Sequence, residues 1–356
     1  MLWIAARTAT FAISLWLCAG AYAQSPACAR NDGTALRDVH WKHGTQAHPL
    51  IGQVYKGERP IAIAEEPCTR SPQQQLMVEL WDAIRTGGIV LLGEVHDNPE
   101  HHAVRGDILW PRLDVVAPAQ GRRPAAVFEH IRTSQQAAVD DFYAKAARSR
   151  RLWRAPDLLR LLDWKESGWP AAEMFYPLFN AALWAKQPIY PGNPVRARMR
   201  ALARGEGPPT DEEIPRLQLA QALPQPLLDA LTVELEGSHC GAVPGSALGS
   251  MGLAQRYTDA HMAEVVVRAA EKHNGAFLLA GNGHVRTDRA VPWYVCRLAP
   301  QRPVVAVMLL EVEEGKTDAS SYLPKSPDGT VAADYVMFTP RQDRPDPCEK
   351  MRQGKP

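Results

Sequence analysis

The sequence has almost no excess of charge of either sign, and this balance argues against one large class of proteins. Its 356 residues carry 40 Lys and Arg against 39 Asp and Glu, for a formal net charge of +1, and they contain no long basic run. Binding to a nucleic-acid backbone depends on clustered Lys and Arg. We therefore expect no nucleic-acid partner.

Several catalytic and metal-binding signatures are also absent. The sequence has no GxSxG elbow of a serine hydrolase, no HExxH helix of a zinc protease and no phosphate loop. No two cysteines are spaced as CxxC, which argues against a zinc thiolate site. Beyond the N-terminus, no stretch approaches the roughly 18 uncharged apolar residues typical of a membrane-spanning helix. We expect no transmembrane span in the mature chain.

Residues 1–23 have the layout of a secretory signal peptide. Arg7 precedes the apolar stretch FAISLWLCAG, and the small residues AYA follow it. Cys18 would suit a lipoprotein anchor, but the bulky Leu17 stands where such signals have a small residue. We therefore expect cleavage after Ala23 and export to the periplasm or out of the cell.

Cleavage there would leave five cysteines: Cys28, Cys68, Cys240, Cys296 and Cys348. An oxidising compartment favours disulfides between them, and spacing alone does not determine the pairing. Because five is an odd number, one thiol is expected to stay free or to pair between chains.

A composition of 46% hydrophobic and 22% charged residues indicates a globular chain, which we interpret as one large α/β domain. Residues 24–74 mix Pro, Gly and polar pieces, and we predict an irregular extension with one strand near PIAIAE. The main domain is predicted over 75–340, with a helical insertion subdomain at about 140–250. Residues 341–356 are expected to be a loose tail unless Cys348 ties them down.

Short apolar runs alternate with helical patterns after the helix predicted at SPQQQLMVELWDAIRT, which Ser71 can cap. The runs are GIVLLG, AAVFEH, QPIYPGN, AFLLAG and VVAVMLLEV. Continuous apolar strands are typical of a sheet that is buried on both faces. The predicted fold is therefore an α/β fold with a mainly parallel sheet flanked by helices, and DYVMFTP is predicted to add an edge strand.

Polar residues stand at the carboxyl ends of four of these strands. They are Glu94 and His96, Glu129 and His130, Asn193, and Asn282 and His284. In parallel sheets, ligands bind in the crevice beyond the carboxyl ends of the strands. We therefore expect these side chains to share one cleft.

The first of these strand ends also has the features of a helix start. Asp97 or Asn98 can cap the helix, and Pro99 suits its first position. His101 and His102 would then lie on the helix, where we interpret them as surface or helix-face polar residues.

Both strand ends carry a Gly-X-X-His motif, GEVH at 93–96 and GNGH at 281–284. Gly281 and Gly283 would permit a positive φ or a close backbone approach. The residues of this cleft suit two kinds of chemistry. The imidazoles of His96 and His284, with Glu94 or Glu129, could bind a divalent transition metal, or one histidine could act as a general base.

Five segments resemble one known family. They are GEVHDNPEHH, WPAAEMFYPLF, SHCGAVP, AQRYTDAHMA and AGNGHVRTDRAVP. In this order they are similar to the ChaN-like haem-binding uptake family, within the superfamily that holds the Tiki and TraB proteins and lies near erythromycin esterase. The resemblance covers about residues 75–315.

The resemblance implies a haem-binding α/β domain with a helical subdomain, a role in iron acquisition, and haem held at a homodimer interface in some members. The family's residues carry over to Gly93, Glu94, His96, Asp97, Asn98, Gly281, Asn282, Gly283 and His284. Less closely matched are Glu129, Gln255, Asp259, Arg286 and Asp288.

The resemblance also implies a tyrosine ligand to the haem iron, and Tyr176 in MFYPLF is the matching position. The alternative is a helix tyrosine that packs among apolar neighbours. The nearby tryptophans would suit either a porphyrin face or a subdomain core: Trp164, Trp169 and Trp184.

Three functions remain open at this point. The first is an exported haem-binding protein that does no chemistry on its ligand. The second is a metal-dependent hydrolase of the Tiki or TraB kind, with His96 and His284 as ligands and Glu94 or Glu129 as ligand or base. The third is a structural hydrogen-bond network that retains no ligand.

Overall fold

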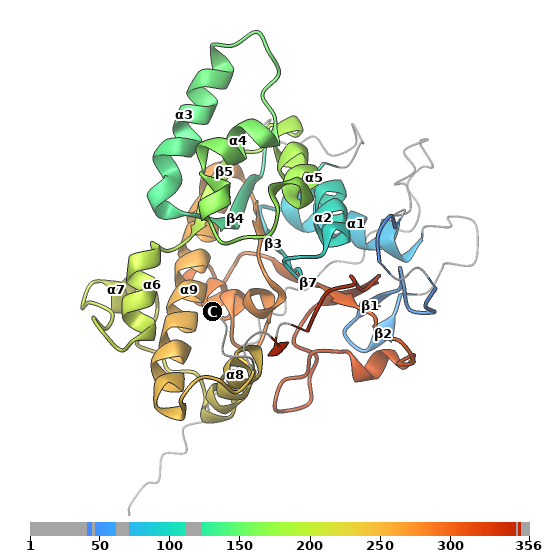
Figure 1. Cartoon of the computed structure of the whole chain (residues 1–356), viewed down its shortest axis with the longest axis vertical. Helices are drawn as coiled ribbons and strands as arrows, with labels where there is room; N and C mark the ends of the chain where they lie inside the picture. The colour runs from blue at the N-terminus through green and yellow to red at the C-terminus, as the bar shows by residue number, and fades with distance from the viewer. Residues whose placement is uncertain (1–40, 45–46, 62–70, 111–122, 347, 350–356) are drawn as a thin grey trace, which may run out of the picture.

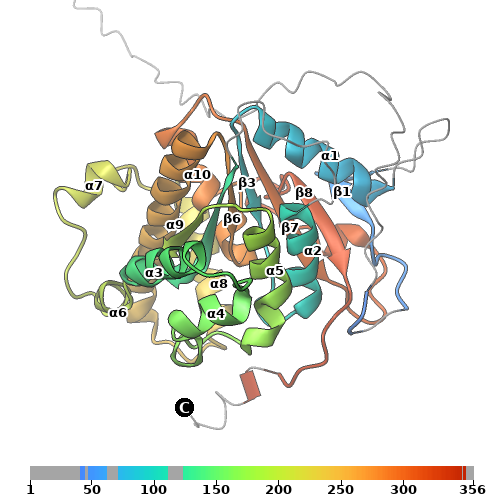
Figure 2. The same cartoon turned by 90° about the horizontal axis from the view of Figure 1, so that it is seen from above.

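The chain folds around one mixed sheet of eight strands in the computed structural model, which describes residues 41–44, 47–61, 71–110, 123–346 and 348–349. The strand order is β2-β1-β8-β7-β3-β6-β4-β5 (strands labelled in Figures 1 and 2). The six strands from β8 to β5 run parallel, and the β1–β2 hairpin adds antiparallel to β8. The predicted α/β fold with a mainly parallel sheet is confirmed.

The predicted apolar runs all become strands of this sheet. The strands are β1 Val54–Lys56, β2 Arg59–Pro60, β3 Ile89–Leu92, β4 Ala125–Arg132, β5 Ile189–Asn193, β6 Ala276–Leu279, β7 Val304–Glu311 and β8 Tyr335–Thr339.

One strand position was wrong. The run DYVMFTP forms β8 but does not lie at the sheet edge, because the β1–β2 hairpin pairs with its outer side. β1 is only three residues long, too short to stand out as an apolar run. Most of the strand predicted near PIAIAE lies outside the described residues.

Ten α-helices connect the strands within the described residues. They are α1 Pro72–Arg85, α2 Pro99–Leu109, α3 Gln136–Ala147, α4 Ala155–Leu161, α5 Ala172–Trp184, α6 Arg196–Ala203, α7 Glu213–Arg216, α8 Gln225–Ser238, α9 Gly245–His273 and α10 Val291–Leu298. The caps follow the predicted pattern. Ser71 caps α1 with a capping box, and Asn98 caps α2 ahead of Pro99.

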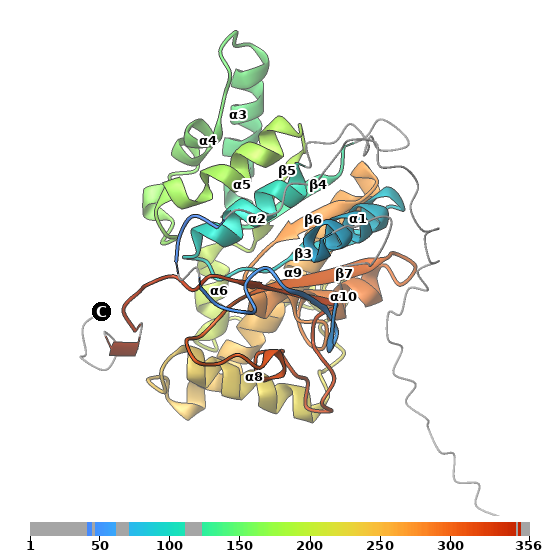
Figure 3. The same cartoon turned by 90° about the vertical axis from the view of Figure 1, so that its right-hand side faces the viewer.

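Helices cover both faces of the sheet. On β3, Val90 and Leu92 point into the layer that contains α1 to α5, whereas Ile89 and Leu91 point into the layer of α6, α9 and α10. Figures 2 and 3 show α2 and α5 on one side of the strands and α9 and α10 on the other. Burial on both faces explains why the strands are continuously apolar.

The stretch from about 140 to 250 contains helices and also β5, an outer strand of the sheet. Its last part, α8, packs antiparallel on the start of α9 through a small apolar cluster of Leu231, Leu235 and Leu248. In Figure 3 this helical hairpin lies on the far side of the sheet from α2 and α5.

The residues after β8 run back over the start of α2. The carbonyl of Pro340 accepts a hydrogen bond from Asn98 Nδ2 at 3.0 Å, and Arg344 pairs with Asp97 and Glu311. A disulfide between Cys240 and Cys348 then joins this segment to the turn between α8 and α9.

Cys296 is also disulfide-bonded, and none of the cysteines in the described residues is free. Within the same residues, no helix combines the length and the apolar character that crossing a bilayer requires.

Candidate functional site

Glu94, two residues beyond β3, is the centre of a buried polar cluster. Only 2% of this residue is exposed. Its Oε1 atom accepts hydrogen bonds from His96 Nδ1 at 2.7 Å and from His130 Nε2 at 2.6 Å. Its other oxygen pairs with the guanidinium of Arg105. Glu94 therefore ties the end of β3 to β4 and to α2.

Helix α2 supplies this cluster with two fully buried side chains, Arg105 and His102. Arg105 Nη2 donates to His102 Nδ1 at 2.9 Å, and His102 Nε2 lies 3.0 Å from the carbonyl of His96. The carboxylate also lies close to this imidazole, with Glu94 Oε2 3.0 Å from His102 Nδ1. Burial lowers the pKa of Arg105 to about 9, which still leaves it charged at neutral pH.

The interpretation of His101 and His102 as surface or helix-face polar residues was wrong, because both are fully buried. α2 packs along α5, and the two helices bury residues in the same apolar layer against the sheet, which encloses these positions. Instead, His101 Nδ1 accepts from the backbone N–H of Val95 at 2.8 Å, and its Nε2 bonds Thr339 Oγ1 at 2.7 Å. Burial lowers the pKa of each imidazole to about 3.

His130 is enclosed by aromatic rings. Trp169 and Phe175 have ring centroids 4.9 and 5.0 Å from the His130 ring, and Trp164 stacks farther away. Trp169 Nε1 also donates to the His130 carbonyl at 3.0 Å. Burial, followed by the charge of Arg105, lowers the pKa of His130 well below its usual value.

A second group of buried polar residues lies on the other face of β4. Glu129 Oε2 accepts from the backbone N–H of Gly281 at 2.7 Å, and Glu129 Oε1 lies 3.4 Å from His284 Nε2. His284 Nδ1 bonds Asp259 Oδ1 at 2.6 Å. His284 therefore stands between two carboxylates.

The pKa shifts in this second group follow from that arrangement. Burial favours neutral His284, but the charges of Glu129 and Asp259 outweigh it and raise the His284 pKa well above 6.5. Burial likewise opposes ionisation of Glu129, but His284 and His96 lower the Glu129 pKa overall. For Asp259 burial dominates, raising the pKa to about 6. The protonated imidazole and its two acidic partners thus form a buried charged triad.

His96 stands between the two groups. Its Nδ1 is bonded to Glu94, while its Nε2 lies 3.9 Å from Glu129 Oε1, beyond hydrogen-bond distance. The His96 side chain is 36% exposed, and its ring centroid lies 4.8 Å from that of Trp169. The predicted meeting of His96 and His284 is therefore present, with Glu129 between them.

The first glycine of each Gly-X-X-His motif, Gly93 or Gly281, is required because neighbouring side chains approach its backbone closely, and not because its φ is positive. None of Gly93, Gly281 and Gly283 has a positive φ. A Cβ atom on Gly93 would lie 2.2 Å from Asn282 Oδ1, and one on Gly281 would lie 2.9 Å from His96 Nε2. Of the two explanations for Gly281 and Gly283, close approach therefore fits Gly281.

The remaining predicted site residues bond to backbone carbonyls or to other side chains of the chain. Asn193 Nδ2 donates to the Glu129 carbonyl, and Asn282 Nδ2 donates to the Leu309 carbonyl. Gln255 Nε2 lies 3.2 Å from His284 Nδ1. Arg286 binds Asp288 through two hydrogen bonds, of 3.0 and 2.7 Å. None of these contacts joins Arg286 to Glu94 or to His96.

Tyr176, the tyrosine matched to the family's haem ligand, lies on α5 next to Phe175. Phe175 faces the cluster, with its ring centroid 3.9 Å from that of His102. Tyr176 is half-buried against the apolar layer of α1 to α5. Burial and the neighbouring Glu173 raise the pKa of Tyr176.

The predicted metal set of His96, His284, Glu94 and Glu129 does not form one compact centre. Within the described residues, the group whose ligand atoms all lie within 4.8 Å of one another is Glu94, His96 and His130. Glu94 is already neutralised by the Arg105 guanidinium, and a second cation there would meet that charge at close range. This arrangement does not favour a metal-dependent hydrolase.

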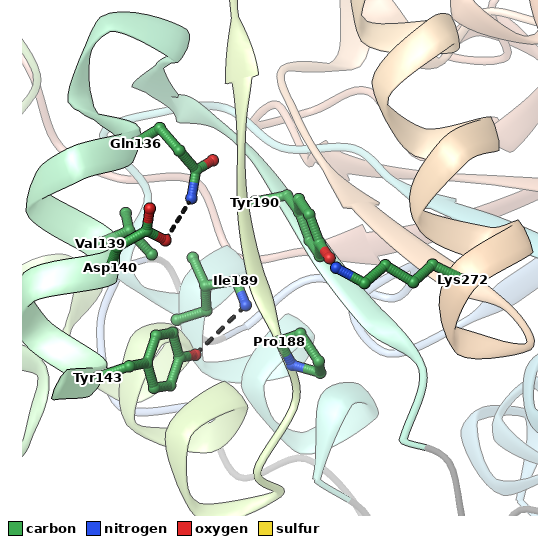
Figure 4. Close-up of a pocket in the computed structure, with 8 residues that line it drawn as sticks. All are labelled: Gln136, Val139, Asp140, Tyr143, Pro188, Ile189, Tyr190 and Lys272. Carbon is green, nitrogen blue, oxygen red and sulfur yellow. Dashed lines mark hydrogen bonds between the residues drawn. The ribbon is translucent and has the colours of Figure 1, made fainter. Parts of the chain in front are cut away.

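A separate pocket lies at the outer strand β5, away from this cluster. It measures about 200 Å³ and is lined on one side of the strand by Gln136, Asp140 and Tyr143 and on the other by Tyr190 and Lys272 (Figure 4). The Tyr143 hydroxyl accepts from the Ile189 N–H at 3.3 Å, which satisfies a backbone donor at the sheet edge.

No role for Arg105 in the site was predicted from the sequence. A signal for it exists, since His101, Val104, Arg105 and Ile108 follow one helical face by spacing. Two apolar residues on that face indicate that it is buried, so its charged members need buried partners.

Comparisons with known proteins find one family and several solved structures that are similar to this chain. The model of a protein family described as haem-binding uptake, Tiki superfamily, ChaN matches residues 80–295. The structure of ChaN of Campylobacter jejuni, titled for cofacial haem binding, is similar with a TM-score of 0.56 and 19% identity, over 80% of this chain and 95% of that one. The type III effector HopBA1 gives a TM-score of 0.38 and 12% identity, over 79% of this chain and 98% of that one. No curated protein matches the sequence.

Proposed function

Because this chain belongs to the haem-binding uptake family of the Tiki superfamily that includes ChaN, we propose that it binds haem through His96 at the carboxyl edge of its sheet. Haem iron is held in proteins by His, Met, Cys or Tyr side chains. Family membership supports the ligand class, and the geometry around His96 supports the position.

His96 would be suited to hold the iron of a bound haem. Its Nδ1 is held by the Glu94 carboxylate at 2.7 Å, which fixes the tautomer and makes the ring a stronger donor. Its Nε2 has no hydrogen-bond partner within the described residues and faces Gly281 and Glu129, and 36% of the side chain is exposed. Trp169 beside it offers an aromatic face for a porphyrin.

Tyr176 on α5 is the alternative ligand in this chain. Burial and Glu173 raise its pKa. Hemin titration of variants at the two positions distinguishes Tyr176 from His96.

We extend the proposal to an exported protein that takes part in haem or iron uptake. Support comes from the signal-peptide pattern of residues 1–23 and from the uptake role in the family description. Mass spectrometry of the protein recovered from a periplasmic or secreted fraction should give a chain that begins at Gln24. A chain that retains Met1 in that fraction would contradict cleavage.

Hemin titration of the purified protein tests the ligand and the site together. Wild-type protein should give a shifted Soret band at micromolar hemin. His96→Gly should lower the affinity at least about ten-fold, and added imidazole should restore the spectrum. Tyr176→Phe should bind within about two-fold of wild type, because its hydroxyl is not a ligand.

The possible results separate the two parts of the proposal. No Soret shift in wild-type protein would overturn haem binding. A loss in Tyr176→Phe, with His96→Gly unaffected, would keep haem binding but overturn His96 as the ligand. His43→Gly, at an exposed histidine, serves as the matched control and should bind as wild type does.

A further inference from the structure

Three arginines gather where β4 ends and α6 begins. Arg132 is the last residue of β4, and Arg196 and Arg200 lie one turn apart on α6. Arg132 Nη2 donates to the Ser167 carbonyl at 2.9 Å, and Arg196 Nη2 donates to the same oxygen. One carbonyl therefore holds two guanidinium groups side by side. We call Arg132, Arg196 and Arg200 the arginine rim.

The arginine rim lacks acidic partners in the described part of the chain. No ion pair within 4.0 Å joins any of the three to an Asp or Glu there, whereas Arg198 on the same helix pairs with Glu213 at 2.6 Å. Burial, with the charges of Arg196 and Arg200, lowers the pKa of Arg132, as expected for like charges held together. An anion placed among the three would relieve this repulsion.

The arginine rim is connected to the proposed haem ligand through Ser167 and Trp169. Ser167, which binds two of its members, also accepts from the backbone N–H of Trp169 through its Oγ atom at 3.0 Å. The Trp169 ring in turn contacts the His96 ring at a centroid distance of 4.8 Å. Ser167 thus joins the arginine rim to the backbone of Trp169, whose ring contacts His96. Arg196 and Arg200 are exposed, so a ligand can reach them.

We propose that the arginine rim binds the propionate carboxylates of a haem that lies against Trp169. The inference rests on the proposed function, since it assumes that haem is the ligand. A haem carries two carboxylates at one edge of an otherwise apolar disc. Arginine binds carboxylates through paired, charge-assisted hydrogen bonds, and three guanidinium groups can serve two carboxylates.

The test compares hemin with hemin dimethyl ester, which keeps the porphyrin and iron but has no free carboxylate. Wild-type protein should bind hemin about ten-fold more tightly than the ester at low salt, and added salt should reduce the difference. In R196Q/R200Q the preference should fall to about two-fold or less, with affinity for the ester unchanged. Both substitutions are on exposed side chains, and circular dichroism will show that the fold is retained.

R148Q/R150Q is the matched control, because it removes the same charge from exposed arginines beyond the end of α3. It should keep the ten-fold preference. Equal affinity of wild-type protein for hemin and ester would overturn this inference alone. So would an equal loss of both ligands in R196Q/R200Q. Failure of wild-type protein to bind either ligand would overturn the proposed function as well.

Discussion

Lowering the pH from 7.5 to 5.5 should destabilise this protein, because three histidines are buried in the neutral form. The pKa values of His101 and His102 are lowered to about 3 by burial, and that of His130 is lowered well below 6.5. In the unfolded chain each imidazole would titrate near 6.5. Below that pH the unfolded state binds protons that the folded state does not, so stability falls.

The hydrogen bonds explain why these imidazoles stay neutral. Nδ1 of His101 accepts from the Val95 N–H, and Nδ1 of His102 accepts from Arg105. Protonation would place a second hydrogen where each acceptor is needed. His130 donates through Nε2 to Glu94, and its Nδ1 is buried without a partner.

The size of the effect follows from proton linkage. Each neutral histidine loses about 1.4 kcal/mol of stability per pH unit below 6.5, so the three together lose about 4 kcal/mol at pH 5.5. Two groups oppose this loss. The pKa of His284 is raised above 6.5 and that of Asp259 is raised to about 6, so the folded state favours their protonated forms. Together they return about 2 kcal/mol and leave a net loss of at least about 2 kcal/mol, because burial also lowers the pKa of His261.

Urea unfolding at pH 7.5 and 5.5, followed by circular dichroism with the disulfides intact, measures this difference. In His101→Asn, whose amide oxygen can still accept from Val95, the loss between the two pH values should shrink by about 1.4 kcal/mol. His43→Asn changes an exposed histidine and should keep the full loss. A wild-type loss below about 0.5 kcal/mol, or the same loss in His101→Asn, would refute the buried neutral state.

Two further perturbations test the charge pair and the disulfide. Arg105→Met leaves Glu94 as a buried charge without its cation and should cost about 3–5 kcal/mol in urea unfolding, whereas Arg105→Met with Glu94→Gln should recover part of that loss. No recovery in the double variant would contradict the pairing. Cys240→Ser with Cys348→Ser opens a link across 108 residues and should cost about 2–4 kcal/mol in the same assay, while a loss below about 1 kcal/mol would show that the link adds little.

Much of the fold could be predicted from local sequence. The apolar runs formed strands because strands covered on both faces need apolar residues at every position, as Ile89 to Leu92 show. Asn98 and Pro99 started α2 because helix starts depend on nearby backbone groups. The position of β8 was wrong because its neighbour β1 comes from a distant part of the chain.

The residues of the candidate site were predictable from the sequence, whereas their partners were not. Polar residues at strand ends follow from the sequence once the strands are recognised as parallel, which is why His96, Glu129 and His284 were expected together. The sequence alone could not assign their partners, because burial of α2 against the sheet selects them. Arg105 becomes the counter-ion of Glu94 only because both side chains are enclosed, and an unpaired charge in that enclosure would be too costly.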